Sequence, residues 1–436
     1  MRNSKLPFTE WQTAFILAVT TIIFFACEPA VEEAAEAASL DLSNYQLDDA
    51  NVLAFGPDQV LFVGDSKAGI VHAISTTATE LKDAVPYGTT ALDKKIASEI
   101  NVPAEDLVIQ DMKIHPLSQE AYVAVKTGLD PSAKSIIAIV TPGSGEVRFL
   151  DVEQASHTQV ALSNPVSTDY NFWRDIPASS LTITDIDYND GYVYVAGLTN
   201  GEFASNLRKI AYPFGAEQAT VGSIEMYHPV HTQKETRAPI RTMAFEEING
   251  ESILIASYTC TPLVTIPTSA IQDGNHIKAK TVAELGFGNA PIDMITFMAQ
   301  EMDGSYDKKL LITHKNRSGS LISLKDLAAA NQGDGLAGVT TMGPAGLNIF
   351  PVPTSGIMHL DEQNQMMLAD LRRNIDNGSV DLISELKGSY FRLSDFIAEY
   401  NFPDYNYPAE QEPTKQFHDM VKPMEGYPEL TSDNMN

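Results

Sequence analysis

The sequence predicts an all-β fold in which repeated antiparallel units stand side by side and close around a central axis. A short strand–turn–strand phrase recurs along the chain. Within each strand, apolar and polar residues alternate with the period of two that is typical of half-buried β-strands. No long amphipathic helical pattern separates the copies, which argues against a parallel βαβ fold.

Each copy of the phrase joins an inner strand to a second strand that is rich in Val, Ile, Ala and Tyr. The copies are Val52–Phe55 with Val60–Gly64, Ile109–Ile114 with Ala121–Val125, Ile183–Tyr188 with Tyr192–Gly197, Ile240–Phe245 with Ser252–Ser257, Ile292–Phe297 with Lys309–Thr313, and Ile357–Leu360 with Gln365–Ala369. Such units cannot bury themselves singly and must stack. We therefore expect six units, or seven if Ser39–Tyr45 or Thr340–Val352 contains another.

Turn residues such as Asn189-Asp190-Gly191 and Asn249-Gly250 mark the hairpins. The segments between copies are long. Thr76–Glu105 predicts short helices, Ser156–Ser180 is aromatic and turn-rich, and Leu324–Ala330 predicts a helical turn or two.

Closure of the ring requires a strand from each end of the repeated region. We expect Ser39–Leu42 to pair with a C-terminal strand such as Val380–Ile383, because this removes an open sheet edge.

This arrangement resembles the β-propeller superfamily, loosely the quinoprotein-like and lactonase-like propellers, over residues 39–387. The WD, Kelch and NHL signatures are absent, so the resemblance implies the architecture and no particular functional residues. The predicted fold is thus an all-β, six-bladed β-propeller with helical and irregular insertions.

The N-terminus has the pattern of an export signal over residues 1–26. Arg2 and Lys5 precede the apolar run Ala14–Ala26, which is too short to span a bilayer as a helix. Cys27 follows directly, as in a bacterial lipobox, although Phe24 and Phe25 stand where such motifs usually carry aliphatic residues.

We therefore expect lipidation at Cys27, with residues 27–38 as a flexible tether and the protein anchored in the bacterial cell envelope, periplasmic or on the surface. Ordinary signal cleavage, for example after Ala35-Glu36-Ala37, is the alternative. Residues 388–436 form an irregular C-terminal extension in this interpretation.

Composition limits the partners. The 436 residues are 44% hydrophobic and 20% charged, and 57 Asp and Glu against 29 Lys and Arg give a net charge of -28. Such an acidic chain is not expected to bind nucleic acid or to adsorb to anionic lipid, because both need a basic face.

The inner strands should line a central channel, and the residues before them share one face with the residues after the second strands. This register gathers basic side chains at one mouth: Lys67, Lys126, Arg241, His314, Lys315, Arg317, Arg372 and Arg373. We expect the mouth to bind an anionic small molecule or glycan, or a protein partner. The candidate ligand-binding residues are Arg237, Arg241, Tyr258, His314, Lys315, Arg317, Asp293 and Asp185. Alternatively, the cations are solvated or paired with Asp65, Asp111, Asp185, Asp293 and Asp370.

A candidate metal set lies in and around the polar stretch that follows residue 227. His228 and His231 are three residues apart, Glu235 follows them, and Cys260 and His314 lie on neighbouring loops of the predicted ring. Imidazole and thiolate suit copper or zinc, and a Cys beside a His can form a nucleophile–base pair. Alternatively, these are ordinary surface or partly buried histidines and a buried apolar Cys.

Asp185 and Asp187 alternate along one strand and therefore face the same side. Such carboxylates can hold a structural calcium ion or act as acid and base. The glycine-rich phosphate and dinucleotide loops, the Gly-x-Ser-x-Gly elbow, the c-type haem motif and the His-Glu-x-x-His zinc motif are absent from the sequence.

The sequence therefore favours a binding protein over an enzyme. The alternatives at the same mouth are a metal-dependent oxidoreductase that uses His228, His231, Cys260 and His314, and a lyase or hydrolase that acts on an anionic sugar. An assembly scaffold is a further alternative.

Overall fold

The computed structural model describes residues 42–387, apart from 79, 129, 131, 170, 174–175, 216–218, 260, 302, 316–317, 353, 355 and 375–376. The chain from Ser39 onward is one compact unit and is described by itself. The predicted signal segment, the tether with Cys27 and the C-terminal extension lie outside the described residues. No helix in the described part of the chain is long and apolar enough to cross a membrane.

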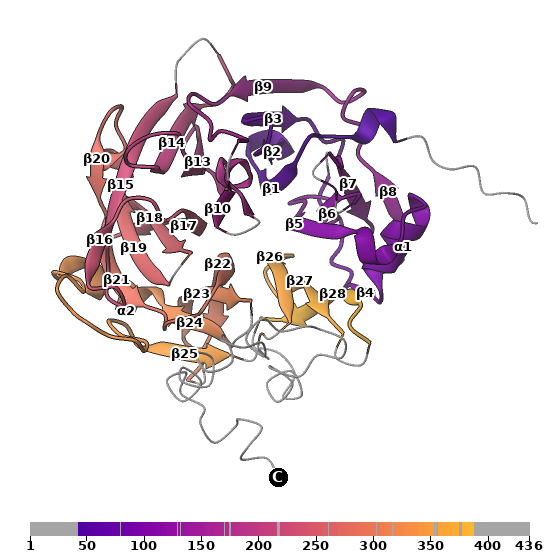
Figure 1. Ribbon diagram of the computed structural model, residues 1–436. Helices are drawn as coiled ribbons and strands as arrows, with labels where there is room; N and C mark the ends of the chain where they lie inside the picture. Colours follow the sequence, from indigo (N-terminus) through magenta and orange to yellow (C-terminus); the bar gives the residue numbers. More distant parts are fainter. Residues whose placement is uncertain are drawn as a thin grey trace, which may run out of the picture. The chain divides into compact units, whose positions relative to one another are not determined.

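The described residues form a six-bladed β-propeller, as predicted (Figure 1). We number the blades by the chain order of their inner strands. Blade 1 contains β1 (Ala50–Phe55), β2 (Leu61–Asp65), β3 (Ile70–Ile74) and β9 (His157–Ala161). Blade 2 contains β5 (Val108–Ile114), β6 (Ala121–Lys126), β7 (Ser135–Val140) and β8 (Val147–Phe149). Blade 3 contains β12 (Asp185–Asn189), β13 (Tyr192–Leu198), β14 (Ser205–Ala211), β15 (Thr220–His228) and β16 (Gln233–Glu235), and β20 (His276–Lys278) pairs with β15 in parallel.

The other three blades follow the same inner-to-outer order. Blade 4 contains β17 (Ile240–Ile248), β18 (Glu251–Tyr258), β19 (Pro262–Pro267) and β21 (Lys280–Glu284). Blade 5 contains β22 (Pro291–Gln300), β23 (Tyr306–His314), β24 (Gly319–Ser323) and β25 (Ile349–Val352). Blade 6 contains β26 (Ile357–Glu362), β27 (Met367–Arg373), β28 (Val380–Leu386) and β4 (Gly88–Thr89).

Elements outside the blades are few. They are α1 (Leu92–Glu99), α2 (Leu324–Gln332), the hairpin β10 (Asn171–Trp173) with β11 (Ile176–Pro177), and the 3₁₀ turns η1 (Ser43–Tyr45), η2 (Pro57–Gln59), η3 (Ala104–Asp106), η4 (Ala178–Leu181) and η5 (Thr268–Ala270). The helices α1 and α2 confirm that Thr76–Glu105 and Leu324–Ala330 contain helical segments. The aromatic segment after residue 156 differs from the expectation, because it supplies β9 as the outer strand of blade 1.

The spatial order of the blades differs from their order in the sequence. Blade 1 packs between blades 2 and 3, as apolar clusters on its two sides show: Leu53 and Val63 pack with Tyr122 and Ile137 of blade 2, and Phe62 packs with blade 3. Around the channel the order is therefore 2, 1, 3, 4, 5, 6, and Figure 1 shows β1 between β5 and the strands of blade 3.

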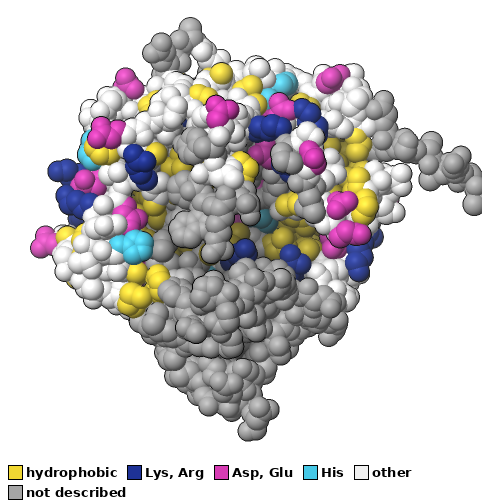
Figure 2. Space-filling model, in the orientation of Figure 1, with side chains coloured by type: hydrophobic (Ala, Val, Ile, Leu, Met, Phe, Trp, Pro, Cys, Tyr) yellow, Lys and Arg dark blue, Asp and Glu magenta, His cyan; other side chains and the backbone are white. Residues whose placement is uncertain are grey.

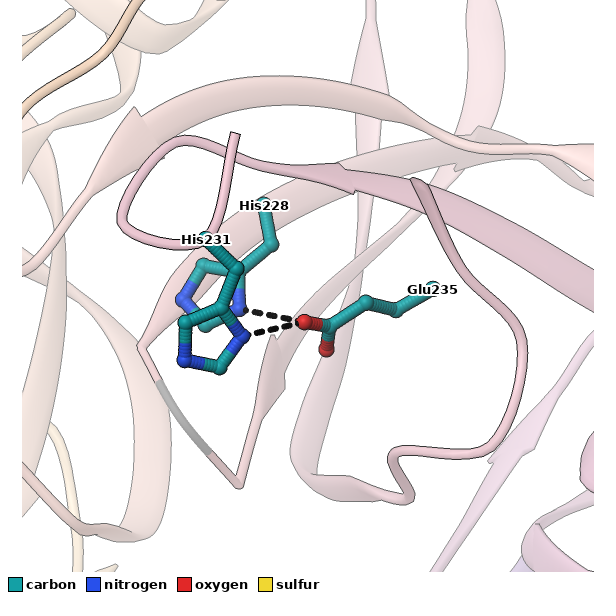
Figure 3. A group of neighbouring side chains, drawn as sticks. All are labelled: His228, His231 and Glu235. Atoms are coloured by element: carbon teal, nitrogen blue, oxygen red, sulfur yellow. Dashed lines mark hydrogen bonds and ion pairs between the residues drawn. The ribbon is translucent and has the colours of Figure 1, made fainter. Parts of the chain in front are cut away.

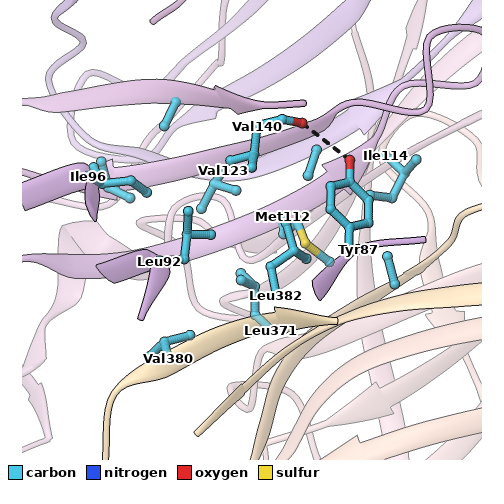
Figure 4. Close-up of a cluster of buried hydrophobic side chains, with 14 of the residues drawn as sticks. Tyr87, Leu92, Ile96, Met112, Ile114, Val123, Val140, Leu371, Val380 and Leu382 are labelled. Carbon is cyan, nitrogen blue, oxygen red and sulfur yellow. Dashed lines mark hydrogen bonds between the residues drawn. The ribbon is translucent and has the colours of Figure 1, made fainter. Parts of the chain in front are cut away.

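Blades 2 and 6 meet where the ring closes. Their shared cluster includes Met112 and Val123 of blade 2, Leu371 and Leu382 of blade 6, and Leu92 of α1 (Figure 4). Similar buried clusters join blades 3 and 4, 4 and 5, and 5 and 6. With the two clusters on the sides of blade 1, these make six apolar interfaces, one between each pair of neighbouring blades.

One of the two strands expected to close the ring is correct and the other is wrong. β28 takes part in closure, as predicted, but it pairs with β4, through Leu382 with Thr89 and Ile383 with Gly88. Leu42 lies instead against the cluster of blades 2 and 6, and residues 39–41 lie outside the described residues. Gly88–Thr89 has too few alternating residues for a strand to be predicted from sequence.

Two hairpins follow the turn chemistry that the sequence predicts. Asp190 and Gly191 have φ of 47° and 84°, and Asn249 and Gly250 have φ of 55° and 80°. Two central residues with positive φ match the twist of the flanking strands. The turns therefore fix the register of β12 with β13 and of β17 with β18.

Candidate functional site

The inner strands line a central channel with two rings of side chains, one residue from each blade. The first ring is Val52, Asp111, Asp185, Thr242, Asp293 and His359. The second ring, two residues further along each strand, is Ala54, Lys113, Asp187, Ala244, Ile295 and Asp361. The two rings lie in adjoining cavities of about 310 Å³ and 340 Å³ that share Lys113, Asp185 and Asp293.

Three aspartates of the first ring bind the backbone of the strands around the channel. Each accepts a hydrogen bond from the next amide of its own strand and one from a neighbouring blade. Asp111 accepts from Met112 and Leu53, Asp185 from Ile186 and Met243, and Asp293 from Met294 and Leu360, at 2.6–3.3 Å. Each of the six blades thus contributes one of these amides, and each of the three carboxylates links two neighbouring blades.

Two cations lie among these carboxylates. Lys113 Nζ is 3.5 Å from Asp293 Oδ1, and His359 Nδ1 is 3.4 Å from Asp111 Oδ1 and 3.7 Å from Asp293 Oδ2. Burial alone would lower the pKa of His359, but Asp111 and Asp293 outweigh it and raise that pKa to about 9. Burial raises the pKa of Asp293, whereas Lys113 and His359 lower it, and the net direction is down.

Farther along the channel, the effect of burial on the pKa outweighs that of nearby cations for two carboxyl groups. Burial raises the pKa of Asp187 and of Asp361 to about 6 in each case, against a smaller opposing effect of Lys113. Asp361 Oδ2 accepts from the Ile114 amide of blade 2, at 2.7 Å. The channel interior is therefore an acidic, internally bonded scaffold rather than a cationic funnel.

A smaller pocket of about 250 Å³ opens beside the channel, between blades 4 and 5. Its walls are mainly apolar, and Arg241 and Lys315 supply the cations: the lining residues are Leu181, Pro239, Arg241, Thr259, Ala290, Pro291, Ile292 and Lys315. Arg241 also lines the first channel cavity. Across the described residues, no hydrogen bond or ion pair joins the side chain of Arg241 or Lys315 to another residue. Burial lowers the pKa of Arg241, with a smaller opposing effect of Asp185.

Two other predicted cations of the mouth are paired with carboxylates, and for Arg372 the partner Asp370 is one that the alternative interpretation named. Lys126 Nζ is 3.7 Å from Asp49 Oδ1. Arg372 is almost fully buried and lies 3.5 Å from Asp370 and 3.8 Å from Glu385. Charged side chains of both signs are scattered over the face in Figure 2. Among the described residues, Arg241 and Lys315 are the predicted mouth cations that line the small pocket.

Six of the eight candidate ligand-binding residues divide into four groups. Asp185 and Asp293 line the channel, Arg241 and Lys315 line the small pocket, Arg237 is exposed and lines neither, and Arg317 lies outside the described residues.

Two candidates face away from the pocket. Tyr258 is buried in the cluster between blades 3 and 4, and His314 is buried with Nε2 3.0 Å from Ser320 Oγ. The following residues, Thr259 and Lys315, line the pocket. Successive side chains of a strand point to opposite sides, so the sequence register was displaced by one residue at both strand ends.

The candidate metal residues do not gather at the channel mouth. His228 and His231 lie beside Glu235, at the hairpin between β15 and β16 on the outer edge of blade 3 (Figure 3). Among the described residues His314 is not part of this group, and Cys260 lies outside the described residues. An outer strand carries its residues away from the axis, which the sequence register did not take into account.

Sequence reasoning missed Lys113, His359 and Glu284. Lys113 and His359 stand two residues from Asp111 and Asp361, on strands whose phase was already known, so period-two alternation could have placed both in the channel. No comparable signal marks Glu284 of blade 4, whose Oε2 lies 3.9 Å from His228 Nε2 of blade 3.

No protein-family model matches the sequence, and no curated protein matches it. The chain is similar to the extracellular domains of Drosophila semaphorin 1b, with 9% identity, a TM-score of 0.33 and coverage of 79% of this chain and 86% of that chain. It is also similar to virginiamycin B lyase from Staphylococcus aureus, with 9% identity, a TM-score of 0.32 and coverage of 79% and 95%. A putative 6-phosphogluconolactonase from Bacteroides uniformis has 11% identity, a TM-score of 0.26 and coverage of 74% and 76%. The blade count rests on the strand pairing, and these likenesses add nothing to it.

Proposed function

We propose that this β-propeller binds an organic anion in the pocket between blades 4 and 5. The observation that carries the proposal is the Arg241 guanidinium, which lines the pocket without a hydrogen bond or ion pair to any described residue. A guanidinium out of bulk water is costly unless an anion balances it, and it binds carboxylate and phosphate in a fork of two hydrogen bonds.

The composition of the pocket supports a class of ligand. Lys315 adds a second positive charge, and Thr259 adds a hydroxyl group. Leu181, Pro239 and Ile292 provide apolar walls that suit a hydrocarbon or ring body. A carboxylate or phosphate ester with an apolar body fits this lining better than a bare inorganic ion.

The channel aspartates support a binding role over catalysis by these groups. Asp111, Asp185 and Asp293 each direct their oxygens to two backbone amides. Carboxylates used in this way hold the inner strands in place.

The test is a thermal-shift screen of the soluble propeller with aromatic and aliphatic carboxylates and phosphate esters. We expect some anions to raise Tm, and Arg241→Ala to weaken their binding about 10- to 100-fold, since a charged hydrogen-bonded group contributes about 1.5–3 kcal/mol. Arg241→Lys should keep part of the affinity. Arg237→Ala is the matched control, because this exposed arginine of the same segment lies outside the pocket. Stabilisation by cations alone, or equal losses in both alanine variants, would contradict the proposal.

We also propose that the protein is exported and lipid-anchored through Cys27 in the bacterial cell envelope. The support is the basic start, the short apolar run and the cysteine that follows it directly. Intact-mass spectrometry of the membrane fraction should give a mature chain that begins at an acylated Cys27. Cys27→Ala should shift the protein out of that fraction, and an unmodified N-terminus located further along the chain would contradict the proposal.

A further inference from the structure

The hairpin of β15 and β16 brings three potential metal ligands together on the outer edge of blade 3. β15 ends at His228, and β16 returns from Gln233 to Glu235. The left-handed backbone of Thr232, with φ of 54°, completes the turn. In Figure 3 both imidazole rings point toward the carboxylate of Glu235.

The donor atoms converge on one point. His228 Nδ1 is 3.0 Å from Glu235 Oε1, and His231 Nδ1 makes a closer contact with the same oxygen. The ring centroids of the two histidines are 4.1 Å apart, and the planes are inclined by 55°. One ligand atom from each of the three residues lies within 4.8 Å of the other two. Two imidazole nitrogens and one carboxylate oxygen are a donor set for zinc.

A buried carboxylate stands behind this group. Glu284 on β21 of blade 4 is fully buried, and Oε2 lies 3.9 Å from His228 Nε2, the nitrogen on the far side of the ring from Glu235. Glu284 Oε1 accepts hydrogen bonds from the Thr261 hydroxyl and the Gly286 amide. A histidine that offers one nitrogen to a metal commonly directs the other to a carboxylate, which fixes the ring and raises its basicity.

The carboxylates of the site and its access to solvent both favour a bound divalent cation. Glu235 and Glu284 bring two carboxyl groups to a site where the side chains of His228 and Glu284 are fully buried. A divalent ion would balance carboxylate charge at such a site. The side chain of His231 is 41% exposed, so an ion can reach the group from solvent.

We propose that His228, His231 and Glu235 bind a divalent zinc-type ion, with Glu284 as the positioning residue of His228. Three protein ligands leave a fourth coordination position open toward the exposed side, where water or a ligand can bind. This site lies on the outer strands and is separate from the pocket of Arg241, so neither proposal depends on the other.

The experiment uses the propeller purified without a metal-affinity tag. After dialysis against a chelator, isothermal titration with ZnCl₂ should give one site, and elemental analysis should recover one zinc per chain. His231→Ala should reduce zinc affinity by more than about 100-fold and should fold normally, because His231 lies on an exposed turn with 41% of its side chain accessible. Glu284→Gln should reduce affinity about 10- to 100-fold while the stoichiometry stays at one.

His276→Ala is the matched control. His276 also lies on an outer strand of blade 3 and stands 3.6 Å from a carboxylate, that of Glu225, but belongs to no three-ligand group among the described residues. We expect this variant to bind zinc like the unaltered chain. In thermal unfolding, zinc should raise Tm of the unaltered chain and of His276→Ala but not of His231→Ala. No zinc site in the unaltered chain, or equal losses in His231→Ala and His276→Ala, would overturn the proposal.

Discussion

At the scale of single residues, the channel holds buried charges of both signs, with more carboxylates than cations. His359 stands between Asp111 and Asp293, and Lys113 stands beside Asp293. Titratable side chains that are buried beside other charges bind protons with different affinity in the folded and in the unfolded chain. The stability of the propeller should therefore depend on pH over an unusually wide range.

His359 sets the alkaline part of this dependence. Its pKa rises from an ordinary 6.5 to about 9 in the folded protein, so the folded chain holds the proton more tightly than the unfolded chain. The stabilisation is complete below pH 6.5 and is lost as pH rises through 9. We expect a loss of about 2–3 kcal/mol between these limits in the free energy of unfolding by urea. His359→Gln should flatten this part of the curve, and an unchanged slope would contradict the assignment.

Asp187 and Asp361 act at lower pH with the same sign. Burial raises both pKa values from 3.8 to about 6, so the folded chain binds more protons between these limits, and stability falls as pH rises from about 4 to 6. The double variant Asp187→Asn/Asp361→Asn should reduce this slope, to which Asp185 also contributes because burial raises its pKa, while the alkaline slope stays. The same urea titration checks it.

At the scale of elements, the short segment around β4 fastens the two ends of the ring. The Tyr87 amide donates to Ser384 Oγ in blade 6, and the Tyr87 hydroxyl donates to the carbonyl oxygens of Gln119 and Val140 in blade 2, at 2.6 and 3.3 Å. Figure 4 shows the ring of Tyr87 within the cluster that both blades share. One residue thus adds both packing and hydrogen bonds to the closure.

Substitutions of Tyr87 separate these two contributions. Tyr87→Ala leaves a cavity between blades 2 and 6 and should reduce the free energy of unfolding by about 3–5 kcal/mol. Tyr87→Phe keeps the ring and should cost about 1–2 kcal/mol, because it leaves buried carbonyl oxygens without their donor. Leu81→Ala is the control, since Leu81 belongs to the same segment and is 71% exposed. Urea unfolding measures all three, and equal effects of Tyr87→Ala and Leu81→Ala would contradict this role of β4.

At the scale of the whole molecule, the repeated phrase predicts blades but not their neighbours. Alternating apolar residues and the turns at Gly191 and Gly250 are local, so the inner pairs of strands follow from the sequence. The interfaces are alike in chemistry: Leu53 meets Ile137 in one and Phe62 meets Ile186 in the next. Any order of blades would bury such faces, and therefore the exchanged positions of blades 1 and 2 could not be predicted.

The residues of the site also separate into those that a local pattern could place and those that it could not. Arg241, Asp185 and Asp293 could be placed because each lies within the first three residues of an inner strand in a known phase. Tyr258 and His314 were misplaced because strand ends do not fix which side the last residue faces. The approach of Glu284 to His228 depends on contact between two blades, which no local pattern records.

The outer strand of blade 1 has a consequence for how the chain folds. β9 pairs with β3, although the whole of blade 2 lies between them in the sequence. During synthesis, blade 1 therefore keeps an open edge until residue 161 has been made, and blade 6 closes only when β28 meets β4. Pairings between strands so far apart in the sequence raise the contact order and slow folding. Until β9 is made, the unpaired edge of β3 can pair with another chain. We expect refolding to be slow and the yield to fall as protein concentration rises.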